Sequence, residues 1–299
     1  MGFLDDAADL IDRGMSAAKG AVSSVACEQL GFMRDFCRLC REGAEAGYHE
    51  RNGGNASYVL TGDDMRSARP FFYDEPGPWV PLAAAAPAMG DAHVLLTASG
   101  AYLKNVAAHP ADSAAIVQLD SAGGAWRLVW GLRNGGAPTS EIGAHIASYE
   151  VLRRRGKGEG SVLYHAHPAS VAALTALVEP DSRIMSNLLW RCLTESVIAF
   201  PQGVACLPWM VPGSAALAEA TAEALASFDG CLWQVHGVFA AADSCDGAFG
   251  LVQAIDKAAS VALQVRASSA DGAPVFRLGD GDLRAIAAAY DLPLNEAFL

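Results

Sequence analysis

Apolar residues recur three and four positions apart in several stretches of the chain, which is the spacing of helices that bury one face. This spacing predicts helices over about 28–46, 141–155, 169–178, 181–191, 213–227, 246–265 and 281–290. Short β-prone runs predict strands over about 56–60, 93–97, 114–119, 126–131, 161–167, 195–200, 204–207 and 231–236. Residues 63–90, which are rich in proline, are expected to be mostly loop. Because helices and strands alternate unevenly and several strands are joined by short turns, we expect one α/β domain with a mixed or largely antiparallel sheet covered by helices.

The beginning of the chain has a pattern of its own. Between residues 3 and 25, apolar residues such as Leu4, Ile11 and Met15 recur at helical steps and form a narrow apolar stripe. We therefore divide the chain into an extra amphipathic helix at 1–25 and a globular domain at 26–299.

Composition narrows the class of protein. The chain has 299 residues, of which 52% are hydrophobic and 18% charged, so it can bury a sizeable core. The 33 acidic and 21 basic residues give a net charge of −12, and the basic run at 153–155 suits a helix end, so we expect no nucleic-acid partner. The uncharged stretch 196–218 is interrupted by prolines and glycines, which argues against a membrane span. Seven scattered cysteines and an acidic N-terminus without a secretory signal indicate a cytoplasmic protein.

The most informative pattern is the pair His165 and His167, with His236 far downstream. On a strand, side chains two residues apart point to the same face, so both imidazoles of the pair aim at one point. His236 ends another apolar run, and Gly237 after it permits a close approach of the backbone. Three neutral imidazoles with an open fourth position describe a catalytic zinc site. The alternative is that a bare His-x-His pair is structural or incidental, and a structural zinc site needs a fourth ligand.

Three polar turns are candidates for binding an anion. Small side chains, amides and hydroxyls in them allow backbone N–H groups to approach a ligand, and one turn lies at a predicted helix start. Together they suggest a phosphate cradle without lysines, although a single glycine turn is usually only a turn. The residues are Asn52, Gly54, Asn55, Ser99, Gly100, Thr139 and Ser140.

Two carboxylates have both a functional and an ordinary interpretation. Glu141 is either a general base or a first-turn glutamate that complements the helix dipole. Glu195 begins an apolar run and is either an exposed strand end or a second functional acid. His145 lies four residues after Glu141 on the same helix face, where it either supports the site residues from behind or packs in an ordinary way, and ordinary packing is the favoured interpretation. The remaining histidines, 49, 93 and 109, are expected at the surface.

Several segments, taken in chain order, resemble the rhamnulose-1-phosphate aldolases, a family of class II zinc aldolases. The resemblance covers roughly residues 28–299, and Tyr48 and Pro168 depart from it where Trp and a small residue are expected. The segments are Glu-Arg-Asn-Gly-Gly-Asn at 50–55, Ser-Gly-x-x-x-x-Asn-Val at 99–106, Trp-Gly-Leu at 130–132, Pro-Thr-Ser-Glu at 138–141, His-x-His at 165–167, Thr-Glu at 194–195, Leu-Pro-Trp-Met-Val-Pro-Gly at 207–213 and His-Gly-Val-Phe at 236–239.

The resemblance implies a three-layer α/β fold and a reversible cleavage of L-rhamnulose 1-phosphate to dihydroxyacetone phosphate and L-lactaldehyde. It implies that His165, His167 and His236 hold one Zn²⁺ per subunit. It further implies that Glu141 handles the proton at the enediolate carbon, and that Glu195 from a neighbouring subunit assists at the aldehyde oxygen. The turn residues above would bind the phosphate, and the family implies a homotetramer with the active site near a subunit interface.

Other functions remain open from the sequence. The nearest is another reaction on the same scaffold, such as cleavage of L-fuculose 1-phosphate or epimerisation of a phosphopentose. A more distant alternative is a non-catalytic binding module of the adducin type, which predicts eroded metal ligands. Residues 1–25 either dock the enzyme, for example to a bacterial microcompartment, or form an extra helix on their own subunit.

Overall fold

The protein is built around one nine-stranded sheet, seen in the computed structural model that describes residues 27–268 and 276–299. The strand order is β2-β5-β4-β3-β1-β6-β9-β8-β7. Every neighbouring pair is antiparallel except β7 and β8, so the prediction of a largely antiparallel mixed sheet is confirmed. The strands are β1 (Asn55–Val59), β2 (Val80–Pro81), β3 (His93–Thr97), β4 (Ala114–Leu119), β5 (Ala125–Gly131), β6 (Val162–Ala166), β7 (Ala205–Leu207), β8 (Gly230–Trp233) and β9 (Gly237–Ala242).

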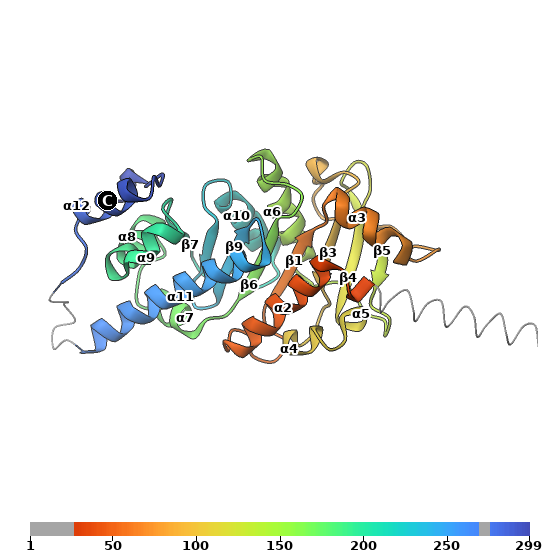
Figure 1. The fold of residues 1–299 in the computed structure, drawn as a ribbon, viewed down its shortest axis with the longest axis horizontal. Helices are drawn as coiled ribbons and strands as arrows, with labels where there is room; N and C mark the ends of the chain where they lie inside the picture. The colour runs from red at the N-terminus through yellow and green to blue at the C-terminus, as the bar shows by residue number, and fades with distance from the viewer. Residues whose placement is uncertain (1–26, 269–275) are drawn as a thin grey trace, which may run out of the picture.

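Each face of the sheet carries its own apolar core, which makes a three-layer fold (Figure 1). The larger core lies under α2 (Gly31–Glu45), α4 (Leu103–Val106), α7 (Ala169–Thr175), α8 (Ser182–Cys192), α9 (Thr194–Ala199), α11 (Cys245–Ser268) and α12 (Asp280–Ala289). The smaller core lies under α6 (Ile142–Arg154), α10 (Ala215–Ala224) and the 3-10 turn Pro87–Met89. Strands alternate between the two cores, as Leu95 faces the first and Leu96 the second.

Two strand predictions were wrong. The run at 195–200 is the short helix α9, because Val197 and Phe200, three residues apart, are both buried in the larger core. An apolar run of this length fits a strand or a helix equally well, and packing against the neighbouring helices decides it. The run at 231–236 ends as β8 at Trp233, and a turn leads from there into β9, which was not predicted as a separate strand.

The remaining elements complete the connections. The stretch 63–90 is less irregular than expected, since Thr61 caps α3 (Gly62–Ala68) with a reciprocal pair of hydrogen bonds to Asp64. Further elements that were not predicted are β2, the short helices α4 and α5 (Pro110–Ser113), and the 3-10 turns Arg69–Phe71, Pro87–Met89 and Glu296–Phe298. Within the described residues, no helix combines the length and apolar character needed to cross a membrane. The predicted helix at 1–25 lies outside the described residues.

Candidate metal centre

The three predicted histidines meet at the carboxyl end of β6. His165 is on β6, His167 follows the end of that strand, and His236 lies in the turn between β8 and β9. The ring centroids are 4.7 Å apart for His165 and His167, and each of these lies 4.9 Å from that of His236. Ligand atoms from the three rings lie within 4.8 Å of one another, so a single ion can contact all of them.

Hydrogen bonds fix which ring nitrogens are free. Nδ1 of His165 donates to the carbonyl oxygen of Val238 at 3.0 Å, and Nδ1 of His167 donates to Oε1 of Glu50 at 2.7 Å, since both oxygens can only accept. The Nε2 atoms of both rings are then bare, yet they lie 3.0 Å apart. A cation that both lone pairs contact would remove the repulsion between them at that distance. A carboxylate or carbonyl behind each ring is also the usual support of a metal-bound imidazole.

The electrostatics of the cluster also suit a metal. Burial lowers the pKa of His165 well below its ordinary value, and the neighbouring His167 and His236 lower it further. Burial likewise lowers the pKa of His236 to about 4, with a further contribution from His167. Both imidazoles are therefore neutral near pH 7, which is the form that binds a divalent cation.

Close backbone packing brings the hairpin turn to the strand. A Cβ at Gly237 would collide with the carbonyl oxygen of Ala166 and lie 3.0 Å from the ring of His167. Only glycine permits this approach, so the prediction made from Gly237 is consistent with the contact. His236 thus reaches the cluster from a turn in which Val235 has a φ of +50°.

A cavity of about 230 Å³ opens over the histidine cluster. Every predicted site residue other than Glu195 lines it, together with Gly53, Ala98 and Pro212. Because none of the lining residues is Lys or Arg, an anion there would be held by amides, hydroxyls and backbone N–H groups near the first turn of α6. The predicted residues that meet in it are Asn52, Gly54, Asn55, Ser99, Gly100, Thr139, Ser140, Glu141, His165, His167 and His236.

Glu141 lies at the N-cap of α6 and faces this cavity, which supports its functional interpretation. Burial raises the pKa of Glu141, while the hydrogen bond from Asn55 and the nearby His167 oppose the rise. Nδ2 of Asn55 donates to Oε2 of Glu141 at 2.7 Å. A carboxyl group with a raised pKa is suited to accept and return a proton near neutral pH.

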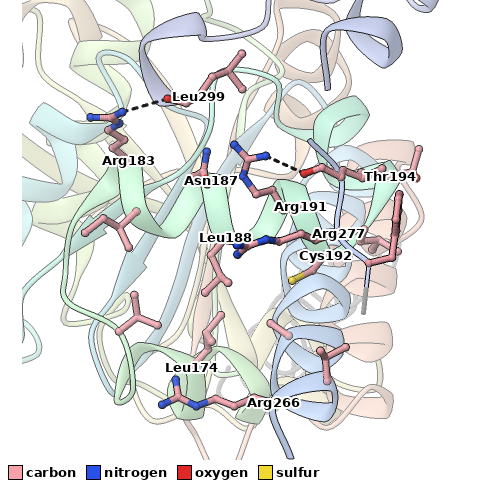
Figure 2. A pocket seen from close by; sticks show the side chains of 17 residues that line it. Leu174, Arg183, Asn187, Leu188, Arg191, Cys192, Thr194, Arg266, Arg277 and Leu299 are labelled. Atoms are coloured by element: carbon pink, nitrogen blue, oxygen red, sulfur yellow. Dashed lines mark hydrogen bonds between the residues drawn. The ribbon is translucent and has the colours of Figure 1, made fainter. Parts of the chain in front are cut away.

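Glu195 lies elsewhere. Its side chain is exposed in the first turn of α9, and it does not line the histidine cavity of the same chain. The adjacent Thr194 lines a larger cavity of about 830 Å³ between α8 and α11 (Figure 2). Arg183 and Arg191 in that cavity bind backbone carbonyls of Leu299 and Leu278. The larger cavity shares no lining residue with the histidine cavity, so it is a separate feature.

Sequence reasoning missed Glu50 as a support of the site, and it favoured the ordinary interpretation of His145 over a supporting one. Glu50, which accepts a hydrogen bond from His167, is the first residue of the segment 50–55 that resembles the aldolase family. Its carboxylate, five residues before Asn55, is the sequence feature from which a supporting role could have been predicted. His145 was expected to pack in an ordinary way, but both of its nitrogens are hydrogen-bonded, one of them to Asn55. Of the histidines expected at the surface, His109 is exposed, whereas His49 and His93 are partly buried. The ring of His49 lies between the carbonyl of Gly53 and the hydroxyl of Tyr164.

Comparison with known proteins gives a consistent result. Residues 34–263 match the family model described as class II aldolase and adducin N-terminal domain. The chain is 39% identical to the rhamnulose-1-phosphate aldolase of Pectobacterium carotovorum subsp. carotovorum (strain PC1), over 74% of this chain and 80% of that protein. It is 34% identical to the rhamnulose-1-phosphate aldolase of Yersinia pestis (strain Pestoides F), over 87% of this chain and 94% of that protein.

Solved structures share the fold. A sugar-phosphate aldolase from Thermotoga maritima superposes with a TM-score of 0.63 at 23% identity, over 78% of this chain and 93% of that one. An L-fuculose 1-phosphate aldolase superposes with a TM-score of 0.55 at 19% identity, over 86% and 94% of the two chains. Together with the retained histidines, these likenesses show that the chain belongs to the class II aldolases and, among them, to the rhamnulose-1-phosphate aldolase family.

Proposed function

We propose that the protein cleaves L-rhamnulose 1-phosphate reversibly to dihydroxyacetone phosphate and L-lactaldehyde. The observation that carries the proposal is one cavity that unites three imidazoles, a partly buried carboxyl group and polar turns without lysine. Relatives at 34–39% identity bear the name of this activity. The retained ligands argue against a non-catalytic module.

His165, His167 and His236 would hold the metal, for which we propose Zn²⁺, because three imidazoles with an open position are the usual donor set of catalytic zinc. When bound, the ion supplies a Lewis acid for the negative charge that develops as the C3–C4 bond breaks. The protein's own groups have to orient the substrate and move its protons.

We assign the proton transfer at carbon to Glu141. In the cleavage direction it returns a proton to the carbon that has lost its bond, and in the synthetic direction it removes one. Asn55 restrains one carboxylate oxygen, Oε2, and Oε1 remains available for this transfer. The partly buried position of Glu141 and its raised pKa support the assignment.

We assign phosphate binding to the three turns. Asn52, Gly54, Asn55, Ser99, Gly100, Thr139 and Ser140 would surround the phosphate with uncharged donors. The start of α6, a helix of 13 residues, adds the partial positive charge of a helix N-terminus. Because these donors carry no charge, the phosphate keeps its own charge when it binds. Its position is then determined by where the donor N–H and O–H groups point.

Glu195 requires a second subunit in this proposal. Its exposed place on α9, outside the cavity of its own chain, supports a role across an interface of a homotetramer. Two inactive variants, Glu141→Gln and Glu195→Gln, test this when they are mixed and reassembled. Complementation to about a quarter of the wild-type rate is expected from random mixing in a ring. Mixed assemblies without activity would refute the shared site.

The substrate is tested by coupled detection of dihydroxyacetone phosphate. L-rhamnulose 1-phosphate, L-fuculose 1-phosphate and pentose phosphates are compared as purified, after chelation and after zinc is restored. Release from the first that is lost on chelation and recovered with zinc supports both assignments. Faster release from L-fuculose 1-phosphate would instead favour the related reaction, whose enzymes share the fold.

A cytoplasmic location and the division at residue 25 also belong to the proposal. All seven cysteines are free, as expected in a reducing compartment. The family match begins at residue 34, which leaves 1–25 for another role such as docking to a partner. Deleting 1–25 should then change localisation or partner binding and leave cleavage intact. Unchanged localisation and partner binding would end the docking hypothesis.

A further inference from the structure

A row of polar side chains lies behind the cavity, between β1 and α6. Asn55 and Ser57 are two residues apart on β1, and His145 and Tyr149 are four residues apart on α6, so each pair shares one face of its element. All four are nearly inaccessible to solvent, the most exposed being Asn55 at 6%. Only Asn55 reaches the cavity, and the proposed function gives the others no role.

The hydrogen bonds in this row point in one direction. The carboxylate of Glu141 can only accept, so Asn55 presents Nδ2 to it and Oδ1 to His145. An amide oxygen also only accepts, and therefore Nε2 of His145, 2.6 Å away, carries a proton.

The histidine then has one nitrogen left to accept a bond. Burial lowers the pKa of His145 to about 3, so the ring is neutral and Nδ1 is bare. The hydroxyl of Ser57 donates to Nδ1 at 2.6 Å, so its oxygen accepts from the hydroxyl of Tyr149 at 2.7 Å; the carbonyl oxygen of Ser161 is the more distant acceptor for Tyr149, at 3.3 Å. Every bond from Tyr149 onward is therefore directed toward Glu141.

We propose that His145, held in its Nε2-protonated form by Ser57 and Tyr149, is a positioning residue for Glu141. By occupying Oδ1 of Asn55, it leaves the amide N–H of Asn55 for the carboxylate and fixes where that carboxylate lies in the cavity. The inference rests on the proposed function, in which Glu141 transfers the proton at carbon. His145 itself does not line the cavity and acts only through Asn55.

A space-filling role does not explain this arrangement. The ring of His145 packs 5.2 Å from that of Phe239, where an apolar side chain would fit the surrounding core. Burying an imidazole is unfavourable unless both nitrogens are bonded, and here both are. A neutral imidazole is the rigid side chain that accepts at one nitrogen and donates at the other.

Two substitutions of His145 separate positioning from packing. In His145→Gln, the side-chain amide reaches about as far as Nε2 and retains a donor for Asn55. In His145→Asn, the amide is shorter and reaches only about as far as Nδ1. We expect kcat to fall about 10–100-fold in His145→Asn, with partial recovery in His145→Gln. Solvent deuterium exchange into dihydroxyacetone phosphate, which isolates the proton transfer at carbon, should fall by the same factor.

A spectroscopic measurement tests the direction of the row without any substrate. Nitrogen chemical shifts of ¹⁵N-histidine-labelled protein distinguish protonated from bare ring nitrogens, and signals absent from His145→Gln identify residue 145. We expect a proton on Nε2 and none on Nδ1. The opposite tautomer would overturn the inference. Because no substrate is used, this result is distinguishable from a failure of the substrate assignment.

Ser57→Ala keeps the experiment decisive if His145→Asn does not fold. It removes one hydroxyl, and we expect the Nε2-protonated form to become less favoured and kcat to fall about 3–10-fold, a weaker effect because Asn55 keeps its partner. Metal content and thermal unfolding are measured on each preparation. A folded, metal-replete His145→Asn or Ser57→Ala with wild-type kcat and wild-type deuterium exchange would refute the positioning role.

Discussion

Replacing Glu50 should weaken metal binding although Glu50 is not a ligand. Its carboxylate accepts the Nδ1 proton of His167 at 2.7 Å, which keeps Nε2 of that ring bare and turned toward the other histidines. Partial burial raises the pKa of Glu50, but the hydrogen bonds from His167 and from its own backbone, together with the charges of His167 and His49, outweigh it and leave the pKa below the ordinary value. In Glu50→Ala the ring of His167 is free to rotate or to change tautomer, so a fraction of the molecules present no lone pair.

The expected magnitude follows from exposure. Supports of this type change metal affinity by about 10–100-fold. The side chain of Glu50 is 67% exposed, so water screens its charge, and we expect the lower end of this range. A tenfold loss corresponds to about 1.4 kcal/mol of binding free energy. Glu50→Gln retains an oxygen acceptor without the charge and should lose only about threefold.

Competition with a fluorescent zinc chelator measures these affinities. Glu223→Gln, an exposed substitution on α10 remote from the cluster, is the matched control. Wild-type zinc affinity in Glu50→Ala would refute the reasoning, and so would an equal loss in Glu223→Gln.

Three further predictions concern stability. Gly54→Ala should destabilise the fold more than Gly47→Ala in chemical denaturation. Both glycines have positive φ (+74° and +78°), so an alanine at either position is strained by about 1–2 kcal/mol, but only a Cβ at Gly54 would lie 2.6 Å from a carbonyl oxygen, that of His165. Equal losses of unfolding free energy in the two variants would contradict the role of this contact. Zinc at about 100 times its dissociation constant should stabilise the folded protein by about 2.7 kcal/mol, measured as a higher thermal midpoint; the same increase in His167→Ala would argue against the cluster as its site. Burial lowers the pKa of His93 to about 4, against a value near 6.5 in the unfolded chain, so below pH 6.5 the unfolded chain binds more protons than the folded one. As the pH is lowered from 6.5 to 4, the contribution of His93 to the free energy of unfolding should fall by up to about 1.4 kcal/mol per pH unit. His93→Gln should reduce that slope in denaturation experiments relative to the exposed-site control His109→Gln, and equal slopes in the two variants would contradict it.

The sequence predicted best where a local rule determines geometry. His165 and His167 point to one place because side chains alternate along a strand, and Gly237 allows the close approach of the hairpin. Glu195 shows the opposite case, since its segment satisfies both helix and strand patterns and contacts with α8, α11 and α12 decide between them.

Contacts between distant segments were beyond prediction from the sequence. The register that sets Asn55 opposite His165 joins β1 and β6, which are neighbours in the sheet although β2 to β5 lie between them in the sequence. His145 finds its partners on β1, about ninety residues earlier, so no short motif contains both sides of the bond. The turn at Gln234–His236 also carries no glycine or proline signal, which explains why β9 was not separated from β8.

The order of strands has a consequence for synthesis. Strands β3 to β5 pair with their sequence neighbours and can form early, whereas β6 pairs with β1, made long before it, and with β9, made long after it. A nascent chain that has not yet released His236 from the ribosome carries two of the three histidines and lacks the second neighbour of β6. In the metal site proposed above, full coordination therefore waits until the hairpin has left the ribosome, so we expect complete metal binding only after this point of translation.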